Sequence, residues 1–207
     1  MRVLVDGKEA RELVPGEQSL AQVYRELVGR LFLEGRTVVA VVLDGQAVTD
    51  EELTKLLDGE RAPCETMELR TLDTVELSRE TLTEVLKHLE RLRDGLQLTI
   101  DHLGRGERAM ALAALRPTLE VWLAICEAVQ KVCVLVHVDL TTKMDDRSVG
   151  ELQQSVIDTL GDVQGAIEQE DWAAFAEVLA HKLLPSVEPW EALVISLRDR
   201  LETDQKT

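Results

Sequence analysis

Residues 37–59 read TVVAVVLDGQAVTDEELTKLLDG and place a strand, a turn and a short helix in direct succession. The uncharged run at 37–43 is rich in β-branched valine, and the turn dipeptide Asp44-Gly45 closes it. Asp50 then stands where a helix N-cap is expected, directly before EELTKLLDG. The stretch therefore predicts a buried strand that is followed by a short helix.

The residues before this stretch predict a hairpin and a longer helix. RVLV at 2–5 is a short β-branched run, and residues 9–14 are a candidate return strand. A helix is predicted over residues 19–34, with Ser19 as its N-cap. Its apolar residues recur at spacings of three and four, and so share one face: Leu20, Val23, Leu27 and Leu31.

A last strand follows the short helix. Met67, Leu69 and Thr71 alternate with Glu68 and Arg70, which is the two-residue period of a strand with one buried face. The predicted order is therefore strand, strand, helix, strand, short helix, strand.

This order over residues 1–72 resembles the β-grasp fold of ubiquitin-like proteins. The segment 41–59, followed by the strand at 67–70, resembles the second half of ubiquitin in its layout. Ubiquitin and the related sulfur-carrier proteins act through a C-terminal Gly-Gly tail, whereas residues 70–73 here read RTLD and continue into a helix. The resemblance therefore implies a compact platform whose sheet meets a partner, and not conjugation or sulfur transfer.

The strand at 37–43 is apolar on both faces. Strand alternation predicts that Val39 and Val41 point away from their neighbours in the strand, and that Leu4 shares their outer face. A strand that is apolar on both faces is normally covered on both sides. We therefore predict Leu4, Val39 and Val41 as partner-binding residues; the alternative cover is the rest of the same chain, and a homodimer through this face is a further possibility.

From Ser78 onward the apolar period becomes helical. The first long helix shows a heptad-like seam that Val85 and Leu92 widen, and the second shows the same rhythm, in which Pro117 predicts a kink or a break. The two predicted seams are Leu82, Leu86, Leu89, Arg93, Leu96, Ile100 and Leu103, and then Leu112, Leu115, Leu119, Trp122, Cys126, Val129, Cys133, Val136 and Leu140.

Two further helical segments complete the chain. Ser148 and Glu151 form a predicted capping box, and Asp171 is the predicted N-cap of a fourth segment, which Pro185 and Pro189 are expected to bend or split. Short connections between long helices imply antiparallel neighbours. The predicted fold class is thus α+β, with a β-grasp-like domain at residues 1–73 followed by an antiparallel, mainly four-helix bundle at residues 74–207.

Charge and cysteine content restrict the classes of partner. The formal net charge is −16, and it divides into −6 over residues 1–73 and −10 over residues 74–207. Phosphate backbones and anionic membranes require basic patches, so neither nucleic acid nor a membrane is expected as a partner. No apolar run of membrane-spanning length and no apolar signal region are predicted. Three cysteines do not suggest a disulfide framework, and the predicted location is cytoplasmic.

No motif in the sequence carries recognisable chemistry. Glu84/His88 and Glu177/His181 are four residues apart, which is the wrong spacing for a di-iron bundle. Cys126, Cys133 and His137 share a helix, but Cys126 and Cys133 lie in the predicted seam, where cysteine packs as a small apolar residue. Phosphate-binding glycine loops and calcium-loop patterns are absent from the sequence. No metal and no cofactor are therefore predicted.

The β-grasp-like domain and the helical bundle are both architectures that favour binding, and the sequence shows no catalytic motif. Together they indicate a non-catalytic interaction protein: an adaptor, a chaperone or an assembly subunit that binds a protein partner or a second copy of itself. The alternative is an enzyme or ligand-binding helical bundle whose site the sequence does not reveal. A bundle cavity lined by several inward polar groups would favour the alternative, and a solid apolar core with an exposed apolar patch would favour the interaction protein.

Overall fold

A computed structural model describes the chain except for residues 11–19, 60–64, 145 and 205–207. The Cα positions divide the chain into two compact units, Met1–Leu77 and Ser78–Thr207. The boundary falls inside one long helix, α3, which starts immediately after the last strand of the sheet.

The N-terminal unit contains a five-stranded mixed sheet in the order β2-β1-β5-β3-β4. The first and last strands of the unit, β1 and β5, pair in parallel at its centre, and the other pairs are antiparallel. This order agrees with the predicted β-grasp-like layout. The strands are β1 Arg2–Val5, β2 Lys8–Glu9, β3 Arg36–Leu43, β4 Gln46–Ala47 and β5 Thr66–Asp73.

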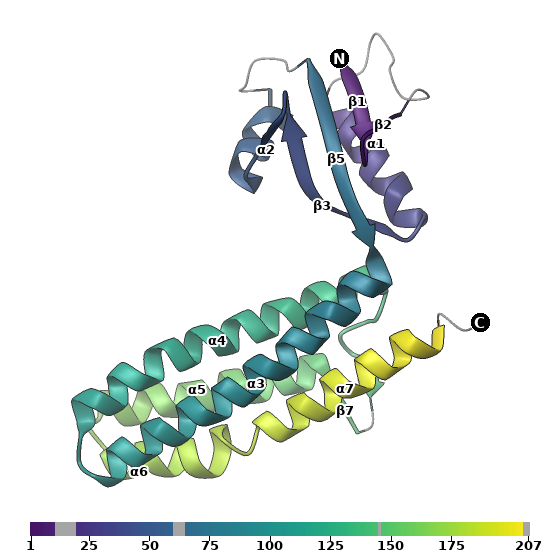
Figure 1. Ribbon diagram of the computed structural model, residues 1–207. Helices are drawn as coiled ribbons and strands as arrows, with labels where there is room; N and C mark the ends of the chain where they lie inside the picture. The colour runs from purple at the N-terminus through teal and green to yellow at the C-terminus, as the bar shows by residue number, and fades with distance from the viewer. Residues whose placement is uncertain (11–19, 60–64, 145, 205–207) are drawn as a thin grey trace. The chain divides into compact units, whose positions relative to one another are not determined.

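Two helices accompany the sheet, and α1 (Leu20–Leu33) crosses one of its faces (Figure 1). The predicted apolar face of α1 packs on alternate residues of the central strands. Gly35, with φ +73°, follows the end of this helix in the left-handed conformation that glycine tolerates. The buried residues of this core are Val3, Val23, Leu27, Leu31, Val41, Leu43, Leu56, Met67 and Leu69.

The second helix, α2 (Asp50–Leu57), begins one residue earlier than predicted. Its N-cap is Thr49, and not Asp50. The Thr49 hydroxyl accepts a hydrogen bond from the Glu52 amide, and the Glu52 carboxylate accepts one from the Thr49 amide. This is a complete capping box, which leaves Asp50 in the first turn, where its charge favours the helix dipole. The predicted cap Ser19 and most of the candidate strand 9–14 lie outside the described residues; β2 comprises only Lys8 and Glu9.

A β-bulge in β3 corrects the predicted strand alternation. Val38 pairs with Thr71 and Ala40 with Arg70, so Val39 is the extra residue on this strand. The bulge reverses the alternation that follows it, which turns Val41 toward the α1 side. Val41 is only 5% exposed and belongs to the apolar core, whereas Val39 is 46% exposed. The prediction that Val39 and Val41 share an outer face is therefore wrong.

The C-terminal unit consists mainly of helices that lie side by side (Figure 1). The fourth helical segment is interrupted at residues 184–186, where Pro185 was expected to bend or split it. The α+β class is confirmed, but a four-helix bundle is not. Its elements are α3 Thr74–Gly104, α4 Arg108–Leu135, the hairpin strands β6 Lys143–Met144 and β7 Arg147–Ser148, α5 Val149–Glu168, α6 Trp172–Val178, the π-helical turn η2 Leu179–Leu183, and α7 Val187–Asp204.

The predicted caps of α5 and α6 are both present. The Ser148 hydroxyl and the Glu151 carboxylate exchange hydrogen bonds with each other's backbone amides, which completes the predicted box. The Asp171 carboxylate accepts from the Ala174 amide at 3.0 Å. By contrast, of the kink or break predicted at Pro117, the break is wrong, because α4 is continuous from Arg108 to Leu135. Proline removes only one backbone donor, and the ring at Pro117 is exposed, where it does not disturb the packing.

The buried faces of the long helices are rotated from the predicted seams. In α3, Val85 and Leu92, which were expected to widen the seam, are buried together with Thr99, whereas Arg93 is exposed and Leu86 and Ile100 are half-buried. In α4 the stripe follows Ala111, Leu115, Thr118, Trp122, Ile125, Val129, Val132 and Cys133, whereas the predicted Leu112 is exposed and Leu119 and Cys126 are half-buried.

Threonines occupy three of the buried seam positions. Each satisfies its hydroxyl by donating a 2.8 Å hydrogen bond to the carbonyl four residues earlier: Thr99 to Gly95, Thr118 to Ala114 and Thr159 to Ser155. A buried hydroxyl is costly only when it lacks a partner. These residues can therefore act as small, nearly apolar side chains in the helical core.

Candidate interaction surfaces

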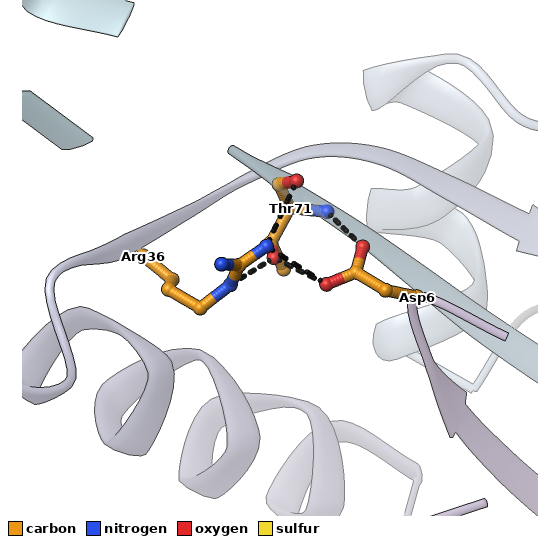
Figure 2. A network of polar contacts seen from close by, with 3 residues as sticks. All are labelled: Asp6, Arg36 and Thr71. Carbon is orange, nitrogen blue, oxygen red and sulfur yellow. Dashed lines mark hydrogen bonds and ion pairs between the residues drawn. The ribbon is translucent and has the colours of Figure 1, made fainter. Parts of the chain in front are cut away.

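A network of polar side chains joins three strands of the N-terminal sheet. The Asp6 carboxylate accepts hydrogen bonds from the backbone amide and the hydroxyl of Thr71, at 2.8 and 2.7 Å, and pairs with the Arg36 guanidinium at 3.0 Å. Arg36 also donates to the Thr71 hydroxyl oxygen at 2.6 Å. Figure 2 shows the three side chains converging where β1 ends beside β5. The Asp6 carboxylate thus accepts the hydrogen bond from the Thr71 amide that a backbone carbonyl of β1 would accept if the strand continued.

An open cleft of about 750 Å³ borders this network. Its charged residues are balanced in sign, and both arginines have acidic partners: Arg36 pairs with Asp6, and Arg30 pairs with Glu34 at 2.9 Å. The geometry therefore indicates that these side chains hold β1, β5 and β3 together.

The Asp6 network makes a testable contribution to stability. Burial raises the pKa of Asp6, but the hydrogen bonds from Thr71 and the charge of Arg36 outweigh it, so the pKa lies below its ordinary value. A depressed carboxyl pKa stabilises the fold above the unfolded-state pKa, and this stabilisation is lost as the pH falls through the folded-state pKa. Because the carboxylate is 37% exposed, we expect Asp6→Asn to cost no more than about 1 kcal/mol at pH 7, and the cost to shrink below about pH 4.

The urea midpoint of the NMR signals of Tyr24, the single tyrosine and a neighbour of the N-terminal core, measures this effect. Asp6→Ala should cost more than Asp6→Asn, because Asp6 has φ +49°, which alanine adopts poorly. Glu51→Gln, which alters an exposed ion pair with Lys55, is the matched control. A cost for Asp6→Asn that is unchanged between pH 7 and pH 3 would contradict the role of the charge.

The residues considered for metal or nucleophilic chemistry are not assembled into a site. Within the described parts of the chain, no three His, Cys, Asp or Glu side chains are placed to hold a metal ion. Glu84 pairs with Lys87 at 2.6 Å, and not with His88. In the loop after α4, the Asp139 carboxylate accepts from the amide and hydroxyl of Thr141, which closes a local turn and lowers the pKa of Asp139.

The two cysteines of α4 are unpaired and sit in apolar surroundings. Cys133 is buried and Cys126 is half-buried. Burial raises the pKa of both thiols, that of Cys126 to about 11. Because the thiolate is the reactive form, neither thiol is prepared for nucleophilic chemistry at neutral pH. The third cysteine, Cys64, lies outside the described residues.

The predicted partner-binding residues of the sheet occupy different environments. Leu4 is half-buried on the face opposite Val3, Val39 is largely exposed, and Val41 is in the core. Leu72, near the end of β5, is 45% exposed. The outer face therefore presents isolated apolar side chains, and partner binding there stays a prediction for Leu4 and Val39.

A more continuous apolar surface lies on the outward side of α4. The exposed residues of α3 are polar or charged apart from Leu98 and Gly104, whereas those of α4 are mostly alanine, leucine, methionine, valine and proline. Four of the charged outward residues of α4 neutralise each other in two ion pairs, Arg116 with Glu120 and Lys131 with Glu127, and Arg108 lies over the Trp172 ring. The apolar members are Ala109, Met110, Leu112, Ala113, Pro117, Leu123, Ala124 and Val134.

Contacts between α4 and α5 extend this surface to a second helix. The Gln130 amide donates to the Gln153 side chain at 3.0 Å, and Gly150, in the first turn of α5, donates to the Leu140 carbonyl in the loop after α4. The two helices are thus antiparallel. Cys126, one turn before Gln130 on α4, therefore lies level with Ile157, one turn after Gln153 on α5. We call the resulting apolar strip the α4–α5 strip: Leu123, Cys126, Val134 and Ile157.

Three of the four side chains of the strip are strongly exposed. Leu123 is 65%, Val134 68% and Ile157 60% exposed. These exposed side chains make the strip a candidate binding surface. These residues were not predicted as binding residues because they lie outside the predicted seams. The available signal was an apolar stripe on α4 wider than one packed face requires.

By length and composition, α4 is also the one helix in the described parts of the chain that could cross a membrane. Its most apolar window has a mean hydropathy of 1.4 and is 28% buried. The expectation that no segment qualifies is therefore corrected for α4. A core helix of a globular unit passes the same test, and the buried stripe of α4 packs in the helical core.

Comparison with known proteins assigns the helices to a family. A family model described as "Domain of unknown function (DUF8042)" matches residues 80–193, more than half of the chain. The chain belongs to this family. No curated protein and no solved structure matches it.

The matched span of DUF8042 begins in the second turn of α3 and ends in α7. It contains the whole α4–α5 strip and excludes the N-terminal sheet. The exposed apolar surface thus belongs to the part of the chain that defines the family.

Proposed function

We propose that this protein is a non-catalytic interaction protein (an adaptor, chaperone or assembly subunit) whose main docking surface is the outward side of α4 with the α4–α5 strip. The observation that supports this most directly is the exposure of Leu123, Val134 and Ile157 on helices whose inner faces are already packed. A cytoplasmic location forms part of the proposal, and it fits the unpaired thiols of Cys126 and Cys133.

The arrangement of charges supports docking by an apolar partner surface. Between the two ion pairs of α4, residues 121–126 carry no charge. An apolar centre with a polar rim is the usual anatomy of a protein interface, in which buried apolar anchors supply most of the binding energy. The outer face of the sheet, with Val39 and Leu72, is a second candidate surface in this proposal.

A photo-crosslinking amino acid placed at position 123 tests the proposal in cells that make the full chain. We expect discrete adducts between the protein and a partner after irradiation. The same group at position 98, on the exposed face of α3, is the matched control because Leu98 is 49% exposed. Equal adduct patterns at both positions, or none at position 123, would rule out the α4 surface as the docking site.

A further inference from the structure

The exposed side of α4 carries a second seam, separate from the stripe that packs in the helical core. Its members recur at steps of four and three residues along almost the whole helix, which is the spacing that lines up one face of a helix for a partner helix. All eight members are exposed, and they span about 37 Å along the helix. We call them the outer seam: Ala109, Ala113, Arg116, Glu120, Leu123, Glu127, Gln130 and Val134.

The outer seam is complementary to itself when two α4 helices run antiparallel. A two-fold axis at the level between Val121 and Trp122 sets each residue of the seam opposite another residue of the seam. Every layer of the interface is then filled from both helices, as the packing of knobs into holes requires. The four kinds of layer, each of which occurs twice, are Ala109 with Val134, Ala113 with Gln130, Arg116 with Glu127, and Glu120 with Leu123.

Both the charged and the apolar residues of the seam fit this register. Arg116 of each copy faces Glu127 of the other, so two ion pairs join the copies. Leu123 lies only about 4.5 Å along the helix axis from Leu123 of the second copy, which lets the two side chains meet. The Glu120 residues of the two copies are also neighbours, but each lies 3.3 Å from its own Arg116, which reduces their repulsion.

From this self-complementarity we infer that the chain forms a two-fold dimer, in which the outer seam of α4 packs antiparallel on the outer seam of a second copy. The inference rests on the proposed function and names its partner. Leu123 and Val134, which are 65% and 68% exposed in the single chain, are then removed from water. Each chain has a net charge of −16, but the two ion pairs of α4 cancel the charge at the centre of this face, so the surfaces that meet do not repel each other.

Other arrangements of the two helices satisfy fewer of these residues. Sliding one helix by one turn in one direction sets Arg116 against Lys131 of the second copy and the two acidic seam residues against each other, which joins like charges. Sliding it by one turn in the other direction pairs Glu120 with Lys131, but it moves the two Leu123 residues about 7.5 Å apart along the helix axis. A parallel pair sets every charged residue of the seam beside its own copy.

Charge reversal tests the inference on the full chain by sedimentation velocity. We expect the native chain to sediment as a dimer at micromolar concentration, and Arg116→Glu or Glu127→Arg alone to weaken the dimer at least about tenfold, because each creates two like-charge contacts between the copies. An equimolar mixture of these two variants should dimerise again, since the two reversed charges then face each other and so do two native charges. Arg91→Glu and Glu84→Arg, on the exposed side of α3, make the same changes of net charge and are the matched controls.

The apolar part of the seam has its own test, because Leu123→Ser should also weaken the dimer at least about tenfold, whereas Leu98→Ser on α3 should not. A dimer that all of these variants leave intact would place the interface elsewhere and overturn the inference. A mixture of the two charge variants that stays monomeric would overturn the antiparallel register. A native chain that sediments as a monomer up to millimolar concentration, with adducts at position 123 that contain only other proteins, would overturn the second copy and leave the proposed function intact.

Discussion

Replacing Gly95 with alanine is expected to destabilise the helical unit by about 2 kcal/mol, although alanine is the better helix former. A Cβ atom at Gly95 would lie 2.4 Å from the Thr118 hydroxyl oxygen and 3.2 Å from its methyl carbon. The side chain of threonine is stiff, and Thr118 is held by its bond to the Ala114 carbonyl, so rotation offers little relief. Gly95 therefore permits the close approach of α3 and α4.

Urea unfolding followed by tryptophan fluorescence measures this effect, because all three tryptophans lie in the helical unit. Thr118→Ala in the same chain should restore most of the loss, since it removes both of the nearest atoms. Gly161→Ala is the matched control: Gly161 is an exposed helical glycine with nothing within 4 Å of the added atom, so this change should stabilise by up to about 1 kcal/mol. A stability unchanged by Gly95→Ala would place α3 and α4 further apart than described.

The Gly95–Thr118 contact also shows why the helices, but not their buried faces, could be predicted from the sequence. In α3 both Leu82-Leu86-Leu89-Arg93 and Leu82-Val85-Leu89-Leu92 obey the spacing of three and four. The choice between them depends on the position of the neighbouring helix, which a single helical pattern does not contain.

Threonine residues also made it difficult to predict which face of each helix is buried. A sequence pattern counts it as polar, so Thr99, Thr118 and Thr159 were not expected in the core. Their hydroxyls are satisfied within their own helices, and this removes the main cost of burying them. A threonine inside a helix, in line with apolar residues, is the signal that would have corrected the faces, because its hydroxyl can share the carbonyl four residues earlier.

The candidate binding surface was predictable only in part. The sequence analysis favoured an interaction protein without recognisable chemistry, but it placed the binding residues on the sheet. Cys126 and Ile157 lie level with each other only because α4 and α5 pack antiparallel in the register that the Gln130–Gln153 hydrogen bond marks. Neither residue is unusual within its own helix.

In the sheet, the bulge at Val39 separates two valines that the sequence treats alike. Val41→Lys should cost at least about 4 kcal/mol, because it buries a charge among the apolar side chains of β5 and α1. That is a large part of the total stability of a small folded unit, so we expect the sheet unit to unfold. Val39→Lys should change the stability by no more than about 0.5 kcal/mol, because the side chain is 46% exposed.

The ring signals of Tyr24 in NMR spectra report the fold of this unit, and tryptophan fluorescence reports the helices in the same sample. Loss of the dispersed Tyr24 signals in Val41→Lys alone is the expected result. Similar behaviour of the two variants would mean that β3 alternates regularly, with both valines on one face. A fold lost in Val39→Lys and kept in Val41→Lys would place the bulge elsewhere in the strand, because the position of the extra residue decides which valine faces α1.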